Sequence, residues 1–404
     1  MITVDEALNK ILSNIYPLGV EKVSSLDALG RVIAEDIYVN RDIPPLDNSA
    51  MDGYALRFED IQIASSNNPI RLEVIEDLPA GFISKKKLER GKAIRIMTGA
   101  PIPKGADAVI PVEETKKEDG SVLIFKAASM GENIRKSGED VKKGDCVISR
   151  GDTIRPAEVG MLASVGRSFV SVYQRPLVAI LCTGDELVDV DGDLDEVKII
   201  SSNSYTLGAQ VRDCGAIPLQ LGIAKDREEE IEEKLRQGLR ADVIISSAGV
   251  SVGDYDFVKD VMKRLGMEMV FWKVAMRPGA PLAFGMIGEK PVFGLPGNPV
   301  SSMISFEQFV RPSLLKMMGN RKLFRPVVEA VLKEDVKKMV GKRYFIRGSV
   351  SFEKNQYFVT TTGEQGSGIL RSMVRANGLI VVPEEQERVR AGDKVKVQLL
   401  DRTP

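Results

Sequence analysis

Residues 177–312 alternate between short apolar runs, which are typical of strands, and longer runs in which apolar residues recur at helical spacing. The apolar runs are short enough to be strands buried on both faces of a sheet; they cover residues 177–181, 217–221, 243–245, 269–274 and 291–293. This alternation predicts a doubly wound α/β domain, with helices on both faces of a parallel sheet. Ligands are then expected just beyond the carboxyl ends of the strands.

Amphipathic runs between these strands predict the helices. Ile231, Leu235 and Leu239 recur at helical spacing after Asp226, and a similar run begins after residue 256. Asn298 and Pro299 have the residue types of an N-cap and a first helical residue, because asparagine can accept a bond from a free N–H and proline has a helix-like φ. A helix is therefore expected to start at Pro299.

Two glycine-rich loops, residues 246–256 and 294–299, each follow a predicted strand and precede a predicted helix. Glycine lets the backbone approach a ligand closely, and the free N–H groups of the following helix attract an anion. Two such loops predict a composite pocket for phosphate or another oxyanion. The loop residues expected to bind substrate are Ser247, Gly249, Ser251, Gly253, Pro296, Gly297, Asn298 and Pro299.

Acidic residues stand at the same strand ends. The first predicted strand leads into Thr183, Gly184, Asp185 and Glu186, a hydroxyl and two carboxylates where such sheets bind ligands. Asp256 opens the helix after the first glycine-rich loop, where N-capping is the simpler role. Carboxylates beside bound phosphate need a cation between them, and Mg²⁺ suits this place because it takes few protein carboxylates. A solvated acidic turn is the alternative interpretation.

Two basic residues, Lys273 and Arg277, lie at the end of the run 269–274 and just after it. They are of the type that holds an oxyanion or a phosphate. Basic residues after a strand are also common on surfaces, so the pair alone leaves both interpretations open. An expected position near the second glycine-rich loop favours the binding role.

Composition excludes several classes of function. The 56 basic and 57 acidic residues balance to a formal charge of -1, which does not favour nucleic acid or an anionic membrane surface. The absence of histidine removes the usual general base and the commonest zinc ligand. Three widely separated cysteines favour a reducing cytoplasm over a disulfide framework. No apolar run approaches the roughly 20 residues that span a bilayer.

The flanking regions differ from the central one. Residues 1–176 predict a mixed α+β region that opens with a helix, for which Thr3 and Glu6 have capping-box spacing. Residues 323–404 carry short strand-like runs separated by polar residues and glycine, which predict a small β-barrel. The expected fold is therefore a multidomain α/β chain, with domain bounds at 1–176, 177–322 and 323–404.

Taken together, these segments resemble the MoeA family, the molybdopterin molybdenumtransferases that include the gephyrin E domain. Family motifs match in order along the whole chain, at residues 47–55, 97–103, 183–187, 249–256 and 294–301, and the string from Asp47 to Tyr54 is the most specific of them. The resemblance implies a central domain of the MogA and MoaB type. It also implies an elongated four-part subunit and a homodimer, with the site between one α/β domain and the partner's N-terminal region.

Family roles follow from matching positions alone. The resemblance implies partner-side catalytic residues Asp52, Thr98 and Asp140, and α/β-side catalytic acids Glu186, Asp226 and Asp256. It implies that Glu186 and Asp256 hold the Mg²⁺ and that Lys273 and Arg277 hold the oxyanion. Two positions depart from the pattern. Arg277 stands where several relatives have lysine, which keeps the charge but changes the donor geometry, and Ala248 stands where many have glycine.

The activity implied by the resemblance is insertion of molybdate or tungstate into adenylylated molybdopterin, with release of AMP. An upstream adenylyltransferase would be a further partner. One alternative is a pterin adenylyltransferase or nucleotide hydrolase, since both resemble the central domain alone. Another is a non-catalytic scaffold, because gephyrin also clusters membrane receptors through this type of domain.

Overall fold

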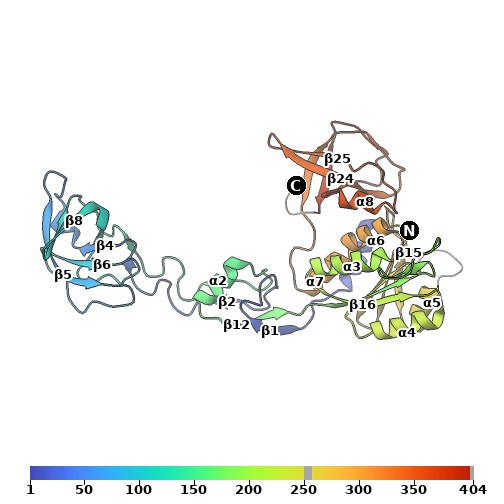
Figure 1. Ribbon diagram of the computed structural model, residues 1–404, viewed down its shortest axis with the longest axis horizontal. Coiled ribbons are helices and arrows are strands. Elements are labelled where there is room, and N and C mark those ends of the chain that lie inside the picture. The colour runs from blue at the N-terminus through green and yellow to red at the C-terminus, as the bar shows by residue number, and fades with distance from the viewer. Residues whose placement is uncertain (250–256, 401–404) are drawn as a thin grey trace. The chain divides into compact units, whose positions relative to one another are not determined.

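A computed structural model of the chain describes residues 1–249 and 257–400 (Figure 1). Three of the residues expected to bind or catalyse, Ser251, Gly253 and Asp256, lie outside this range. The chain forms two compact units, each treated by itself below. The first comprises Met1–Glu35, Gly151–Pro156 and Phe169–Pro404, and the second comprises Asp36–Arg150 and Ala157–Ser168. The sequence-based domain bounds stay predictions.

A six-stranded sheet is the centre of the first unit. Its order is β16-β13-β17-β21-β20-β18, with bounds Ile217–Ala224, Leu177–Thr183, Val243–Ser247, Lys290–Leu295, Ala283–Ile287 and Glu268–Trp272. Strands β16, β13, β17 and β21 pair in parallel, whereas β20 is antiparallel to both of its neighbours. The predicted doubly wound fold is confirmed, with one addition, since the antiparallel strand β20 was not among the predicted strands.

Helices cover both faces of this sheet (Figure 1). Along β13, Val178 and Ile180 pack in the core that holds α3 (Ser202–Asp213) and α6 (Pro299–Ser305). The intervening Ala179 and Leu181 pack in the core that holds α4 (Glu228–Gly238) and α5 (Phe257–Arg264). Because successive side chains of a strand point to opposite faces, this alternation makes β13 apolar throughout.

Helix starts agree with the sequence patterns. The first helix, α1 (Val4–Ser13), begins with the predicted capping box, in which Thr3 and Glu6 exchange bonds of 3.2 and 2.9 Å. Helix α6 begins at Pro299 and Asn298 stands at its N-cap position, as predicted, but the Asn298 side chain makes no capping hydrogen bond. It continues through a short π-helix, η3 (Phe306–Val310), into α7 (Arg311–Met317).

A closed β-barrel follows in the same unit. Its five strands are β24, β25, β22, β28 and β26, and pairing of β24 with β26 closes the ring. The bounds in that order are Arg343–Glu353, Gln356–Thr361, Val327–Leu332, Lys394–Leu399 and Gly378–Val382. The expected small barrel is confirmed. Strand β19 (Met276–Arg277) leaves the α/β domain and pairs with β24.

The second unit contains a separate six-stranded sheet. Its order is β7-β4-β6-β5-β9-β8, with bounds Ala108–Pro111, Gly53–Leu56, Lys92–Ile96, Ile70–Leu78, Ser121–Ile124 and Thr115–Glu118. Strand β4 is buried along its whole length, because apolar residues cover both faces of the sheet there. The apolar pattern of this region did not reveal its topology.

Short elements complete the two units. Paired strands are β1 (Val20–Ser24) with β12 (Phe169–Tyr173), β2 (Ile37–Tyr38) with β11 (Cys146–Ile148), β3 (Asn48–Ser49) with β10 (Ile134–Arg135), β14 (Leu187–Val188) with β15 (Ile199–Ile200), and β23 (Val336–Lys337) with β27 (Arg388–Val389). The remaining helices are α2 (Pro156–Ser164), α8 (Leu370–Val374) and the 3₁₀ turns η1 (Phe58–Ile61) and η2 (Val112–Glu114).

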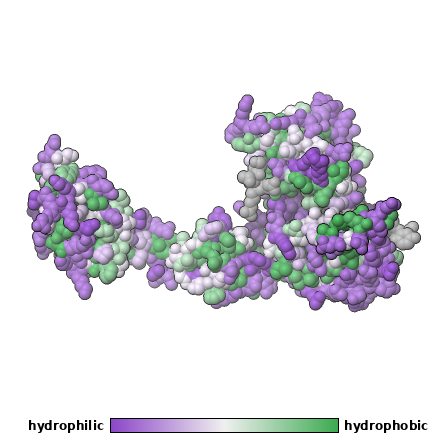
Figure 2. All heavy atoms as spheres, viewed as in Figure 1, coloured by the Kyte–Doolittle hydropathy of each residue, from purple (hydrophilic) through white to green (hydrophobic). Residues whose placement is uncertain are grey.

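Hydrophilic residues cover most of the face seen in Figure 2. Within residues 1–249 and 257–400, no helix combines the length and the apolar content needed to cross a membrane.

Candidate functional site

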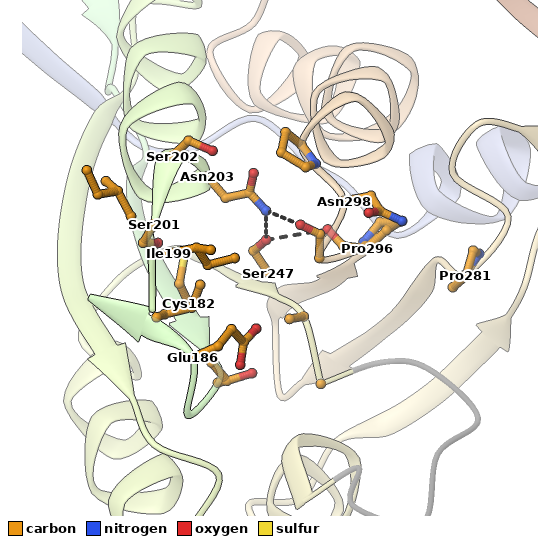
Figure 3. A pocket seen from close by; sticks show the side chains of 17 residues that line it. Cys182, Glu186, Ile199, Ser201, Ser202, Asn203, Ser247, Pro281, Pro296 and Asn298 are labelled. Carbon is orange, nitrogen blue, oxygen red and sulfur yellow. Dashed lines mark hydrogen bonds between the residues drawn. The ribbon is translucent and has the colours of Figure 1, made fainter. Parts of the chain in front are cut away.

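A cavity of about 460 Å³ lies where the parallel strands β13, β17 and β21 end (Figure 3). It is formed by the segments that follow these strands and by the start of α3, because parallel strands bring their carboxyl ends to one edge of the sheet. Eight of the sequence-predicted site residues line it: Thr183, Glu186, Ser247, Gly249, Pro296, Gly297, Asn298 and Pro299. The cavity lies where the alternating pattern predicted a ligand.

Acidic side chains gather at the end of β13. Glu186 lines the cavity, and its carboxylate folds over Gly184, where an added Cβ would lie 2.7 Å from both oxygens. Asp185 accepts a bond of 3.2 Å from the backbone N–H of Asp226. Burial and the nearby charges of Asp185 and Glu186 raise the pKa of Asp226. Three of the predicted acids are therefore close enough to repel one another.

This acidic group has the ligand chemistry that Mg²⁺ prefers, since carboxylate oxygens are hard donors. Asp256, the other expected metal ligand, lies outside the described residues. Among the residues that are described, no three Asp, Glu or Cys side chains are arranged to hold a metal ion. Magnesium needs only one or two protein carboxylates when water and phosphate complete its shell. The donor set thus fits such an ion with Glu186 as a protein ligand.

The loop after β17 requires a small residue. Gly249 has a φ of +69°, and a Cβ there would lie 2.2 Å from Cγ2 of Val258 and 3.1 Å from Oγ1 of Thr183. Ala248 also has a positive φ of 73°, in the left-handed region that disfavours a residue with a Cβ. The alanine that departs from the family pattern therefore carries local backbone strain.

Several cavity residues were not predicted from the sequence. Asn203, in the first turn of α3, donates to Oγ of Ser247 at 2.8 Å and to the carbonyl of Gly297 at 2.7 Å. Cys182 accepts a bond of 3.2 Å from the Ser204 hydroxyl, and burial raises the pKa of its thiol. The run Ser201-Ser202-Asn203 could have revealed these cavity residues, because serine and asparagine are typical of positions where helices start.

The two predicted basic residues lie elsewhere. Neither Lys273 nor Arg277 is among the described residues that line the first cavity. The backbone N–H of Lys273 donates to the carbonyl of Leu282 at 2.9 Å. Arg277 lines a second cavity of about 650 Å³, between the α/β domain and the barrel, together with Arg347.

Arg347 is the largest fully buried side chain of the chain's described part and was not predicted from the sequence. Its Nε donates to the Ser372 hydroxyl at 3.0 Å, and its Nη2 donates to the carbonyl of Gly366 at 3.1 Å. Both partners are neutral, and burial lowers the pKa of the guanidinium to about 10. The same cavity is lined by Arg277, Lys337 and Lys338 and by the carboxylates of Glu334 and Asp335, so its basic residues outnumber its acidic ones. A buried cation with neutral hydrogen-bond partners in such surroundings would attract an anion.

The second unit holds the remaining three predicted residues. Oδ1 of Asp52 accepts bonds from the backbone N–H and the hydroxyl of Thr98, at 2.7 and 2.8 Å. These bonds lower the pKa of Asp52. The backbone N–H of Asp140 donates to the carbonyl of Ile43 at 3.1 Å, and its side chain is exposed. Asp52 and Thr98 thus form one directly bonded pair.

Protein-family models match almost the whole chain. The model of the MoeA N-terminal region (domain I and II) matches residues 2–166, that of a probable molybdopterin binding domain matches residues 179–316, and that of the MoeA C-terminal region (domain IV) matches residues 329–400. The first cavity lies within the second of these matches.

Individual proteins agree with these models. The molybdopterin molybdenumtransferase of Haemophilus influenzae is 38% identical over 98% of both chains, and molybdopterin molybdenumtransferase 2 of Mycobacterium tuberculosis is 40% identical over 92% of both. The crystal structure of the molybdopterin biosynthesis MoeA protein from Pyrococcus horikoshii has a TM-score of 0.84 and 36% identity, and the match covers 99% of this chain and 100% of that one. By fold, motifs and full-length similarity, the chain belongs to the MoeA family of molybdopterin molybdenumtransferases.

Proposed function

We propose that this chain is an enzyme of molybdenum cofactor biosynthesis, which inserts molybdate into adenylylated molybdopterin with release of AMP. The observation that carries the proposal is the cavity at the ends of β13, β17 and β21, which lies within the match to a probable molybdopterin binding domain. Full-length relatives named molybdopterin molybdenumtransferase support the same activity.

In this proposal the first cavity holds the substrate. The turn from Pro296 to Pro299 and the backbone at Gly249 bind its phosphate groups, since both border the cavity and precede helices. Glu186 and Asp256 would hold Mg²⁺, which would neutralise charge on the phosphoanhydride. Asp185 and Asp226 sit beside Glu186 and keep this end of the cavity negative, so that a divalent cation is favoured there.

The oxyanion belongs to the second cavity in this proposal. Arg277 and the buried Arg347 supply positive charge there, together with Lys337 and Lys338, which outnumber the carboxylates of Glu334 and Asp335. Lys273, the other expected oxyanion ligand, does not line this cavity. Molybdate and tungstate have the same charge and similar size, so both fit such a site. In the transfer, the two thiols of molybdopterin would replace oxygen ligands of the metal, and the displaced oxygen would leave as water with the thiol protons. A separate water would cleave the phosphoanhydride and release AMP.

The remaining partners are part of the same proposal. The protein would act in the cytoplasm as a homodimer in which Asp52, Thr98 and Asp140 complete the partner's site. An upstream adenylyltransferase would supply the adenylylated substrate.

The test is AMP release from adenylylated molybdopterin by the purified protein with Mg²⁺, with and without molybdate or tungstate. Oxyanion-stimulated release is expected. Glu186→Gln should lower it by about a hundredfold, since an amide holds Mg²⁺ more weakly than a carboxylate and the charge on the phosphates is then less well neutralised, and Asp256→Asn should act similarly. Glu229→Gln, an exposed change on α4, is the matched control and should keep wild-type turnover.

Other outcomes would assign a different function to the protein. Consumption of ATP with free molybdopterin, and no step that depends on oxyanion, would identify an adenylyltransferase or nucleotide hydrolase instead. A folded protein that leaves the substrate intact but binds a receptor-like peptide tightly would identify a scaffold. Wild-type AMP release by Glu186→Gln would remove Glu186 from the proposed site.

A further inference from the structure

The side-chain amide of Asn203 has a fixed orientation. Its Nδ2 donates one hydrogen to Oγ of Ser247 and the other to the carbonyl of Gly297, at 2.8 and 2.7 Å (Figure 3). The Ser247 hydroxyl donates in turn to the carbonyl of Pro296 at 3.4 Å, so it accepts from Asn203. A flipped amide would place its oxygen against the Gly297 carbonyl, which also only accepts. The oxygen Oδ1 is thereby held away from both loops.

This oxygen is buried and unsatisfied. Asn203 is 8% exposed and lines the first cavity. Its Oδ1 has no hydrogen-bond partner within residues 1–249 and 257–400. Leaving a buried acceptor unpaired is unfavourable, so the position favours a ligand that supplies a donor. An amide oxygen repels phosphate and molybdate oxygens, which are acceptors at neutral pH, so neither group suits this position.

The side chains around Asn203 favour binding of a ligand with a flat ring. Ile199 and Ile200, which line the same cavity beside α3, are 55% and 38% exposed. Exposed apolar side chains at the edge of a cavity are suited to cover the face of a heteroaromatic ring. Glu186 lies apart from Asn203 in Figure 3, with Ser247 between them, so the acidic end of the cavity is a separate region.

We infer that Oδ1 of Asn203 accepts a hydrogen bond from an exocyclic amino group of a heteroaromatic ring on the substrate. This inference rests on the proposed function, since adenylylated molybdopterin carries two such rings, a pterin and an adenine. The exocyclic amine is the donor that both rings share, and it protrudes from the ring edge toward a buried acceptor. Asn203 then selects an amino-substituted ring over its oxo analogue.

Two pairs of probes test this inference by calorimetric binding. AMP and IMP differ at one position, where an amine is replaced by an oxo group, and 6-hydroxymethylpterin and 6-hydroxymethyllumazine differ in the same way. Wild-type protein should bind the amino member of one pair about tenfold more tightly, because the oxo member faces Oδ1 with a second acceptor. The pair that discriminates identifies the ring.

Asn203→Ala should bind both members of that pair equally. Asn320→Ala is the matched control, because the Asn320 amide also bonds a backbone carbonyl, at 3.1 Å, but does not line the cavity; it should keep the tenfold preference. If Asn203→Ala does not fold, Asn203→Ser, whose hydroxyl is too short to replace the amide, serves in its place.

The outcomes distinguish a failure of the role assigned to Asn203 from a failure of the proposed function. Binding of the probes without preference in either pair, or with the same preference in Asn203→Ala, overturns the role of Asn203 and leaves the proposed function standing. Failure of folded wild-type protein to bind any of the four probes overturns the inference, and a further failure to bind adenylylated molybdopterin overturns the proposed function as well.

Discussion

Asp226 carries its charge in unfavourable surroundings, and this has a measurable effect on stability. Its pKa is raised by burial and by Asp185 and Glu186. Because this pKa is higher in the folded state than in the unfolded state, the protonated carboxyl stabilises the fold at low pH. This contribution to the free energy of unfolding is lost as the pH rises through the folded-state pKa. At pH 7, Asp226→Asn should therefore raise the free energy of unfolding, by up to about 1 kcal/mol after solvent screening.

Thermal unfolding measures this difference. The midpoint of Asp226→Asn should exceed that of the wild type at pH 7 by about 2 °C, and the two should converge as the pH falls below about 4. Asp193→Asn, an exposed change in the loop between β14 and β15, should leave the midpoint unchanged. An Asp226→Asn midpoint below that of the wild type at pH 7 would contradict the argument.

At the scale of elements, strands that repeat one simple pattern could be predicted and others could not. The runs that form β13, β17 and β21 are apolar on both faces, and that pattern is visible in the sequence. Strand β20 includes Gly285, where a Cβ would lie 2.5 Å from the carbonyl of Glu268, so tertiary packing and not strand propensity selects its residues. The sheet of the second unit depends on non-local pairing, which local periodicity does not encode.

The site residues likewise fall into those that could be predicted from the sequence and those that could not. Residues such as Thr183, Glu186 and Gly297 could be predicted, because they belong to loops that directly follow apolar strands. Asn203 and Arg347 could not, because their importance comes from partners that are distant in the sequence. Asn203 meets a carbonyl 94 positions away, and Arg347 becomes notable only once its burial without an acidic partner is known.

The antiparallel strand β20 is anchored by one aromatic side chain, Phe284. It is fully buried, and its ring lies 5.8 Å from that of Phe271 and 5.1 Å from that of Phe293. Phe284→Ala should lower the free energy of unfolding by about 3–5 kcal/mol, because it removes buried apolar area and leaves a cavity. Urea denaturation followed by circular dichroism measures the loss.

Phe352→Ala is the matched control for this element. Phe352 also contacts another aromatic ring, Tyr357 at 4.8 Å, but it is 52% exposed on β24. Its truncation should cost less than about 1 kcal/mol, as for most exposed positions. Equal losses from the two variants would show that β20 is not part of the cooperative core.

At the scale of the whole molecule, the proposed function assigns the residues of one site to two chains, and this assignment can be tested without a structure of the complex. Asp52 and Glu186 belong to different compact units of one chain. If the N-terminal unit of each subunit completes its partner's site, a dimer of one Asp52→Asn chain and one Glu186→Gln chain contains one site with both residues intact. A symmetric dimer has two equivalent sites, so this mixed dimer should regain about half of wild-type AMP release.

Two different affinity tags allow the mixed dimer to be isolated after co-expression. A dimer of two Glu186→Gln chains that carry the same two tags is the control, because neither of its sites is intact, and it should stay at the level of the single variant. Should the site instead lie within one chain, every site of the mixed dimer would lack one residue, and its activity would not exceed that of the variants alone. Recovery therefore depends on exchange of residues between subunits, and isolation of monomers only would contradict the proposed dimer itself.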